Sequence, residues 1–397
     1  MAHQNRDQPL FKLALLSLSS ILAIAPSLGP AIPEVAKHLP GVSAANIEML
    51  VTIPNLGIMI FVLVSGFFAS HLGEKRMIMF GLLVATVAGL APLVTNNYFV
   101  ILSSRFLLGA GIGLVNPLAY SLLNILYTSN ESATLLGYAN AITSLCGAVT
   151  AAVAGYLALI NWHATFLIYL LVLLPLGLFA LAIPRDFLGD TQTPAEKAAP
   201  VKTKTWVGWP VLLLAVGLFL FYALLFALYI KVPTALIENR ITTPGAAGLI
   251  VSSFTIAAMV VSLGYGQIYR HLGHYTILIS MLGVGITMML LAESRTAGLD
   301  YLISACSGVF FASTLPYAFM LGAQISPAHA ENLTSSILLI GINLGVFLSP
   351  YLFNLMKLIH PDLSANTSLL IAGMGIVLLG LAFFFASPTA RKEAPVQ

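Results

Sequence analysis

The sequence has little charge for its length. Charged residues make up 8% of its 397 residues and hydrophobic residues 59%, with a mean hydropathy of +0.96. A soluble domain carries roughly a quarter charged residues, so this chain cannot cover a water-facing surface. The formal net charge of only +3 gives no reason to expect nucleic acid as a partner. The composition therefore indicates an integral membrane protein in contact with the lipid bilayer.

Other absences narrow the class further. The only cysteines, Cys146 and Cys306, each lie inside an apolar run, which excludes a disulfide framework and a cysteine-based metal site. The eight histidines have no metal-ligand spacing. No P-loop, nucleotide-binding pattern or catalytic triad pattern occurs. We therefore expect no metal, no cofactor, no ATP, no catalytic residues and no enzymatic activity.

Long apolar runs fill most of the chain. A helix needs about 20 apolar residues to cross the bilayer core, whereas a transmembrane barrel would show short alternating segments. The sequence therefore predicts an all-α membrane protein of twelve transmembrane helices. They are expected at 11–32, 47–70, 77–95, 98–125, 133–158, 163–184, 208–232, 245–268, 275–293, 299–325, 333–357 and 365–387.

Lysine and arginine predict the orientation. The N-terminus resembles a secretory signal, but many more apolar runs follow it, so we expect a retained first span. With a cytoplasmic N-terminus, eleven basic residues fall in inner segments and five in outer ones, which follows the positive-inside rule. We expect a multi-pass protein of the cell membrane with both termini cytoplasmic. The inner residues are Arg6, Lys12, Lys75, Arg76, Arg185, Lys197, Lys202, Lys204, Arg270, Arg391 and Lys392, and the outer ones are Lys37, Lys231, Arg240, Arg295 and Lys357.

One long polar stretch divides the chain. Residues 185–207 are rich in proline, lysine, threonine and alanine, and too short to form a folded domain. We expect a six-helix half at 1–184, a cytoplasmic linker at 185–207 and a second six-helix half at 208–397.

The two halves share a repeated motif. Residues 66–76 read GFFASHLGEKR and residues 266–275 read GQIYRHLGHY, so His-Leu-Gly recurs at an offset of 200 residues. Glu131 and Glu331 match at the same offset, both expected in short loops before a span. Two six-span halves in the same orientation are the parallel repeat architecture of one large transporter class.

The motifs resemble the major facilitator superfamily, specifically its twelve-span drug:proton antiporter branch. Residues 66–76 are similar to the family's signature loop between spans two and three, although Ser70 stands where the family has an acid that latches the cytoplasmic side. The resemblance implies a cytoplasmic gate formed by both loops. Its expected residues are Gly66, Ser70, Gly73, Lys75, Arg76, Gly266, Arg270 and Gly273.

Two further motifs carry the resemblance. Residues 104–113 (SRFLLGAGIG) resemble the family's span-four arginine with its glycine ladder, and residues 147–155 (GAVTAAVAG) resemble the span-five motif, with Ala151 and Ala152 in place of Gly-Pro. Small residues let helices pack closely. The expected packing residues are Gly109, Gly113, Gly147, Gly155, Gly345 and Pro350.

Few ionisable residues are available for proton coupling. Arg105 lies inside span four, where a charge is costly and by default functional, with a cation hydrogen-bonded to helix ends as the structural alternative. No acid lies in the middle of a span; Glu34 and Glu48 are the nearest, at outer span ends. We expect Arg105 with Glu48 or Glu34 to exchange a proton for substrate. Lys231, near an outer span end, is expected to be an interface anchor that reaches the surface.

Polar and aromatic residues within the spans predict a central substrate cavity. Glu48, Thr52 and Asn55 form one stripe, and Tyr222, Phe226 and Tyr229 form another, which helix packing also explains. The expected cavity residues are Asn55, Asn116, Tyr120, Tyr222, Phe226, Tyr229, Tyr317 and Asn343. The aromatics, the methionines and the few charges suit a bulky apolar substrate, including a cationic one.

The function expected from these features is proton-coupled export of hydrophobic or cationic small molecules by a monomeric secondary transporter. Three alternatives stay open at this stage. An uptake carrier or facilitator for a small metabolite has the same fold, a lipid flippase shares an apolar cavity, and a membrane-embedded sensor binds a ligand without carrying it.

Overall fold

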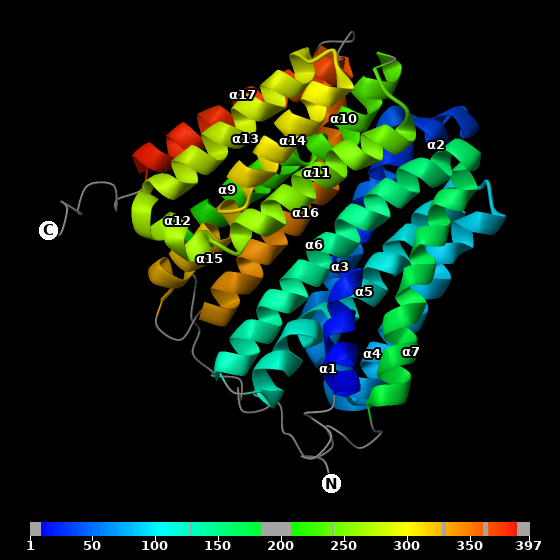
Figure 1. Ribbon diagram of the computed structural model, residues 1–397, viewed down its shortest axis with the longest axis vertical. Helices are drawn as coiled ribbons and strands as arrows, with labels where there is room; N and C mark the ends of the chain where they lie inside the picture. Colours follow the sequence, from blue (N-terminus) through cyan, green and yellow to red (C-terminus); the bar gives the residue numbers. More distant parts are fainter. Residues whose placement is uncertain are drawn as a thin grey trace, which may run out of the picture.

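The chain folds into a bundle of helices. The computed structural model describes residues 9–127, 129–183, 208–239, 241–327, 331–359 and 364–386, so the predicted linker 185–207 lies outside the described residues. The helices are α1 Pro9–Ser17, α2 Ile32–His38, α3 Ala44–Leu72, α4 Glu74–Leu90, α5 Tyr98–Leu126, α6 Ser129–Ile160, α7 Leu173–Ala182, α9 Trp209–Leu225, α10 Ala227–Glu238, α11 Pro244–Ser262, α12 Tyr265–Leu272, α13 Tyr275–Glu293, α14 Ala297–Phe311, α15 Thr314–Ile325, α16 Glu331–Ile359 and α17 Ala365–Ala386 (Figure 1). Four 3₁₀ segments are η1 Leu18–Ile21, η2 Ala25–Ala31, η3 Ala91–Val94 and η4 Trp162–Val172.

The membrane spans agree with the sequence prediction. Within the described residues, eleven helices are long and apolar enough to cross a membrane, and a bent pair, Pro9–Ile21 with Ala25–His38, makes a twelfth. The predicted all-α fold class is therefore confirmed. Glu131 and Glu331, expected in loops, instead lie in the first turns of α6 and α16.

Prolines interrupt two spans that were predicted as continuous. The first span bends by 49° between Ile21 and Ala25. Pro26 lacks the N–H that the Leu22 carbonyl would accept, and it disfavours helical geometry at Ala25. Span ten breaks after Phe311 in the same way, because Pro316 cannot bond to the carbonyl of Ala312.

Two further spans of the second half are also interrupted. Span seven breaks at Phe226, between α9 and α10, and continues to Glu238 rather than ending near 232. Pro233 in α10 frees the carbonyl of Tyr229, and Gly29 of the first span packs against that oxygen. Span eight ends at Ser262, and α12 follows as a separate short helix. Periodicity alone could not show these breaks because the residues on both sides are apolar.

The helices form two sets, which we call the first helix set (α1–α7) and the second helix set (α9–α17). The turns at Gly73 and Gly273 join α3 to α4 and α12 to α13, and both glycines have positive φ, 78° and 51°. This conformation favours glycine and occurs at equivalent positions of the sequence repeat. We call the end of the bundle that carries these turns, with Lys75, Arg76 and Arg270, the basic end.

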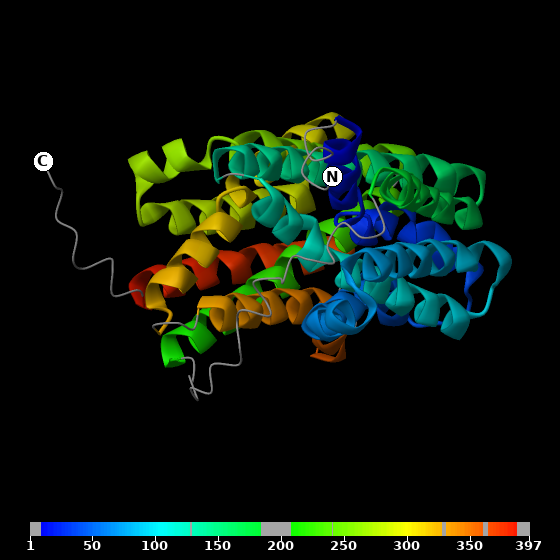
Figure 2. The same cartoon turned by 90° about the horizontal axis from the view of Figure 1, so that it is seen from below.

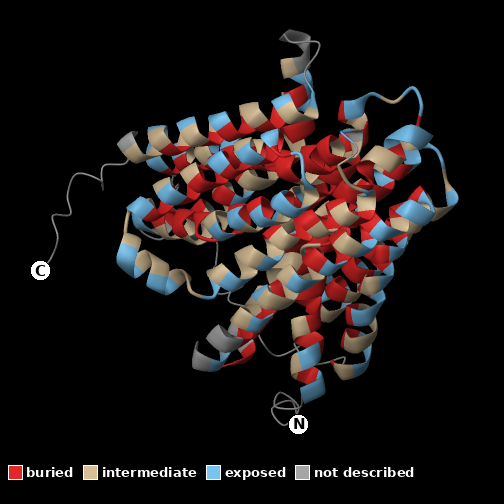
Figure 3. Ribbon diagram, turned by 45° about the horizontal axis from the view of Figure 1, so that its top comes forward, coloured by how far each residue is buried: buried red, intermediate tan, exposed pale blue. Residues whose placement is uncertain are grey.

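The helix sets meet toward the other end, which we call the opposite end. α6 packs along α11, α3 packs against α16, and α10 packs against the first span. Ser252 donates to the Ala148 carbonyl at 2.6 Å, and Thr52 donates to the Phe347 carbonyl at 3.2 Å. In Figures 1 and 2 the sets diverge away from this contact, with α1 starting at one side and α12 and the end of α17 at another. Buried residues concentrate where the sets meet (Figure 3).

The close approach of α3 and α5 gives a testable consequence. A Cβ on Gly109 would overlap the backbone of Pro54, whereas a Cβ on Gly177 of α7 would meet nothing within 4 Å. We expect Gly109→Ala to destabilise the protein, because backbone atoms cannot move aside cheaply. Gly177→Ala is the matched control and should stabilise by about 0.5–1 kcal/mol, as alanine usually does inside a helix. Thermal unfolding in detergent measures both; equal stability for the two variants would contradict the close packing.

Candidate functional site

Arg105 is the most buried charge of the first helix set. It lies two turns into α5, with no exposed surface. Its Nε donates to the Leu50 carbonyl of α3 at 2.9 Å, and one Nη donates to the Ala25 carbonyl of η2 at 2.9 Å. The other Nη donates to the hydroxyl of Tyr169 in η4. The planar guanidinium thus joins three separate segments of the first helix set.

Prolines make these acceptors available. Pro54 lies inside α3 and has no N–H, so the carbonyl of Leu50, four residues earlier, has no normal helical partner. Ala25 is the first residue after the break in the first span. Gly109 lets α5 approach α3 closely enough for Arg105 to reach Leu50. The arginine therefore satisfies backbone acceptors that a helix interruption leaves open.

The described partners of the guanidinium are all neutral groups. Its carbon lies 4.9 Å from the centre of the Tyr169 ring, in a cation–π arrangement. No carboxylate of the described chain pairs with Arg105, so the structure does not bring Arg105 together with Glu48 or Glu34 in an ion pair. The geometry matches the structural alternative, a cation bonded to interrupted helices.

Glu48 instead pairs with Lys231. The Lys231 ammonium donates to a Glu48 carboxylate oxygen, and both residues are buried, with 6% and 5% of their surface exposed. The ammonium also lies 5.6 Å from the centre of the Phe353 ring. Glu48 belongs to α3 and Lys231 to α10, so the ion pair joins the two helix sets at the opposite end. The prediction that Lys231 reaches the surface as an anchor is wrong, because its partner holds it inside the bundle.

Glu34 lies in a different environment. Its carboxylate accepts from Lys37 at 2.8 Å within α2, and His38 lies 3.9 Å away. The side chain is 23% exposed and lines a polar pocket of about 480 Å³, together with Asn96 and His163. These are contacts of a partly solvated helix end within the first helix set. Glu34 joins neither Arg105 nor the second helix set.

The polar stripe of α3 follows Glu48 along the contact between the sets. Thr52 reaches the Phe347 carbonyl of α16, as described above. Asn55, one turn further, donates to the Thr52 carbonyl at 3.3 Å within its own helix. The first two residues of the stripe thus face the second helix set, and Asn55 is partly buried beside them.

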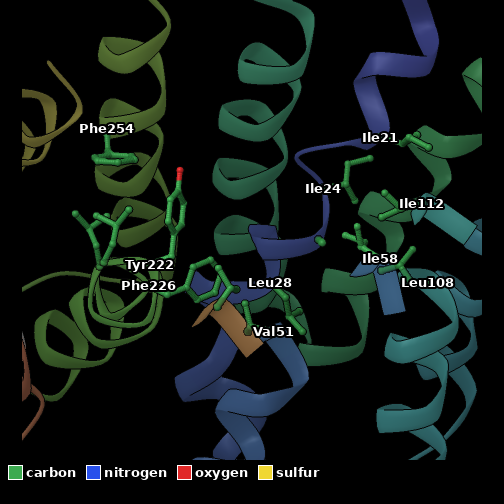
Figure 4. Packing of buried hydrophobic residues seen from close by; sticks show 14 of the residues in the cluster. Ile21, Ile24, Leu28, Val51, Ile58, Leu108, Ile112, Tyr222, Phe226 and Phe254 are labelled. Atoms are coloured by element: carbon green, nitrogen blue, oxygen red, sulfur yellow. The ribbon is translucent and has the colours of Figure 1, made fainter. Parts of the chain in front are cut away.

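The aromatic stripe of span seven surrounds its break. Phe226 stacks on Tyr229 at 5.1 Å, and Tyr229 meets Phe254 edge-on at 5.9 Å. Tyr222 packs edge-on to Phe311 at 6.2 Å. Figure 4 shows Tyr222, Phe226 and Phe254 in one buried cluster with residues of the first helix set. In this conformation these side chains pack together.

The other predicted cavity residues are spread along the bundle. Tyr120 donates to Asn140 at 3.4 Å, and Asn343 donates to the Leu339 carbonyl at 2.9 Å. Asn116 is partly buried in α5, and Tyr317 is buried in α15 beside Tyr269. The structure does not gather this group into one cluster, and their role in binding stays a prediction.

The predicted gate residues lie at the basic end. Lys75 donates to the carbonyl of Ile183, which ties the start of α4 to the end of α7. Arg76 and Arg270 are exposed, and a Cβ on Gly66 or Gly266 would meet nothing within 4 Å. The side chain of Ser70 lies outside the described part of the structure.

The predicted packing glycines lie at helix contacts. Gly113 packs on Ile58 of α3, Gly147 on Ala23 of the first span, Gly155 on Pro244 of α11 and Gly345 on Phe219 of α9. Gly155 therefore serves the contact between the helix sets, not only packing within its own set. Pro350 lies inside α16 without breaking it.

Three buried polar residues were not predicted from the sequence. Tyr169, the arginine's partner, had no distinguishing pattern in its apolar run. Glu74 is buried at the start of α4, and Asp300 is buried in the first turn of α14. The two acids stand at span ends, where a carboxylate is ordinarily solvated, and only their burial marks them.

The described residues thus form an interrupted helical bundle with many candidate membrane spans, a buried arginine and a buried ion pair between its two helix sets. The family model of the Major Facilitator Superfamily matches residues 13–350, and the chain belongs to this family. Its class is therefore that of a secondary transporter of small molecules, not an enzyme.

Individual relatives are distant. The chain is 24% identical over 353 residues to a protein TsgA homolog of Yersinia pseudotuberculosis, covering 86% of each chain. Among solved structures, a POT family transporter in complex with a thioalcohol-conjugated peptide has a TM-score of 0.76 at 14% identity, covering 99% of this chain and all of the other. A D-xylose-proton symporter has a TM-score of 0.73 at 15% identity, covering 98% of this chain and all of the other. These structures show a shared fold, and the antiporter branch stays a prediction.

Proposed function

We propose that this protein is a proton-coupled exporter of hydrophobic or cationic small molecules. It works as a monomer in the cell membrane, with the basic end and both termini in the cytoplasm. The halves at 1–184 and 208–397 rock about a central site and expose it to each side in turn. Two observations support this cycle: the helix sets touch toward the opposite end, and they diverge toward the basic end.

The buried ion pair carries the proposal. Glu48 and Lys231 join the helix sets where the opposite end is closed. A proton taken up by Glu48 removes its charge, and the attraction that holds α3 to α10 is lost. This proton enters from the opposite end, which then opens. Its release toward the basic end restores the pair, so inward proton flow drives export. Glu48 is thus the proposed coupling acid in place of Glu34, and Lys231 takes the role of basic partner that the sequence suggested for Arg105.

The proposed substrate class rests on the aromatic residues at the span-seven break. Tyr222, Phe226 and Tyr229 stand next to the contact between the sets, and their rings offer apolar faces that also attract cations. These rings all belong to the second helix set, so rocking would move them together and uncover their faces toward the first helix set. An aromatic cation such as ethidium fits this chemistry.

Dye efflux from energised cells tests the proposal. Wild type is expected to extrude ethidium, and an uncoupler should stop it. Glu48→Gln, which keeps the shape but cannot ionise, should lose uncoupler-sensitive efflux. Glu34→Gln is the matched control and should stay near wild type, because the ion-pair partners of Glu34, Lys37 and His38, lie in its own helix. Unchanged dye accumulation with wild type, at normal membrane levels, would exclude export of this class.

Uptake of a small metabolite is the second candidate. The solved structure of similar fold described above as a D-xylose-proton symporter favours it. Substrate entry that raises the pH of the outer medium would support proton-driven uptake, whereas entry indifferent to an uncoupler would indicate a facilitator. The same ion pair would serve either direction, so Glu48→Gln separates coupled from uncoupled transport in both cases.

A further inference from the structure

Asp300 is a buried acid that the proposed cycle does not use. It lies in the first turn of α14, at the opposite end, with no exposed surface. Neither carboxylate oxygen has a hydrogen-bond partner among the described residues. The Ser294 hydroxyl lies beside the carboxylate and has no other partner among the described residues. Two polar groups are thus enclosed together at the end of α13 and the start of α14.

No positive charge of the described residues compensates this carboxylate. Glu293 and Arg295 at the end of α13 are exposed, and no described basic residue forms an ion pair with Asp300. The neighbouring Tyr301 hydroxyl donates to the Ala246 carbonyl of α11. An ionised carboxylate enclosed away from any described cation is strongly disfavoured, although the Ser294 hydroxyl and the start of α14 offset part of this cost. The enclosure therefore favours the neutral, protonated form of the acid.

Hydroxyl groups follow Asp300 along the same face of span ten. Ser304 and Ser307 stand four and seven residues further on, which is helical spacing for one face of α14, and Thr314 begins α15 after the break in span ten. All three are buried. Ser304 donates to the Ile250 carbonyl at 2.8 Å. Ser307 and Thr314 have no partner among the described residues. Buried hydroxyls without a protein partner are ordinarily bonded to ordered water.

This face leads to a group of tyrosines at the basic end. Tyr317 follows Thr314 by one turn, its ring lies 6.2 Å from that of Tyr269, and Tyr265 stacks on Tyr269 at 6.1 Å. The Tyr265 hydroxyl is buried without a described partner. Burial, with smaller contributions from Tyr269 and Tyr317, raises the pKa of Tyr265 to about 12. Its phenol therefore stays neutral and can both accept and donate a proton.

We propose that Asp300 is a second proton-binding residue of the transport cycle, and that Ser307, Thr314 and Tyr265 line its proton route to the basic end. The O–H bond of the Asp300 carboxyl breaks, and its proton passes through water and hydroxyl groups to the basic end. The carboxylate left behind takes up another proton from the opposite end, which restores the neutral acid. Steps of roughly 10 Å separate successive unpartnered groups on span ten, so bound water completes the route. The inference rests on the proposed proton coupling, but its first test does not.

Infrared spectroscopy of the whole protein in nanodiscs tests the protonation state without any substrate. Wild type at neutral pH is expected to show the carbonyl band of a protonated carboxyl group. Labelling all aspartates with ¹³C should shift this band, which separates Asp300 from Glu48 without a mutation. Asp300→Asn should remove the band, and Ser304→Ala, which removes a hydroxyl already bonded within the protein, should retain it. A band absent from wild type, or unmoved by the label, would overturn the inference.

Transport supplies the second measurement. Asp300→Asn is expected to lose uphill, uncoupler-sensitive ethidium efflux and to retain downhill exchange, because asparagine fills the same space. Thr314→Val should slow uphill efflux, while Ser304→Ala keeps the wild-type rate. Uphill efflux at the wild-type rate in Asp300→Asn would refute the second proton site. If wild-type cells extrude no dye, the proposed export is wrong, and the infrared band alone then tests whether Asp300 is protonated.

Discussion

Replacing Lys231 by methionine is expected to cost about 3–5 kcal/mol of stability and to abolish coupled transport. Methionine keeps the length of the aliphatic chain but leaves the Glu48 carboxylate buried and unpaired. Removing one member of a buried ion pair is costly because the other charge stays desolvated. Unfolding of the purified protein in mixed micelles measures the loss, and dye efflux measures the activity.

The double variant Glu48→Gln with Lys231→Met is the control for this experiment. Removing both charges relieves the desolvation, so most of the lost stability should return, as it does when buried ion pairs become neutral. Coupled transport should stay absent because no acid is left in the pair. If Lys231→Met alone is as stable as wild type, the ammonium and the carboxylate are not buried together in the membrane.

Arg105→Ala is expected to be inactive and to lose about 3 kcal/mol of stability or more. Alanine leaves the carbonyls of Leu50 and Ala25 and the hydroxyl of Tyr169 without their donor. Each buried group left unsatisfied costs about 1–3 kcal/mol. The first span, α3 and η4 would then lose the side chain that joins them. Unfolding in mixed micelles and the amount of protein in the membrane measure the effect.

Two further variants separate the charge of Arg105 from its geometry. Arg105→Lys keeps the charge, but a single ammonium cannot bond to three groups arranged around a planar guanidinium, so it should recover only part of the stability. Tyr169→Phe removes one acceptor and keeps the ring, and we expect a smaller loss of about 1 kcal/mol. Full recovery by lysine would show that charge, rather than the three-way contact, is what the site requires.

Much of the fold follows from local properties of the sequence. Apolar runs of sufficient length must become helices in a bilayer, since no other open structure satisfies their backbone groups. The repeat at an offset of 200 residues reappears as two turns with positive φ at Gly73 and Gly273. Pro26 and Pro316 account for the breaks in spans one and ten, because proline acts on the carbonyl four residues earlier. Pro54 and Pro350 lie inside unbroken helices, so a proline in the sequence does not by itself predict a break. The break at Phe226 has no such local mark.

The site was less predictable because its residues interact across the bundle. Lys231 and Glu48 are 183 positions apart, and each stands near a predicted span end, where solvent exposure is the usual outcome. Glu34 stands at an equally suitable span end, yet pairs with Lys37 of its own helix. Nothing in the local sequence distinguishes these two acids. The helix that packs against each one decides between burial and exposure.

The sequence alone determined the membrane-spanning helices, the internal repeat and the position of Arg105 inside a span, since each depends only on composition and spacing along the chain. Only the tertiary structure decided which charges are paired, which are enclosed and which reach the surface. It placed Glu48 against Lys231, enclosed Asp300 without a partner, and directed Arg105 to backbone carbonyls. The physical reason is that the cost of a charge in a membrane depends on its surroundings, and those surroundings come from other helices.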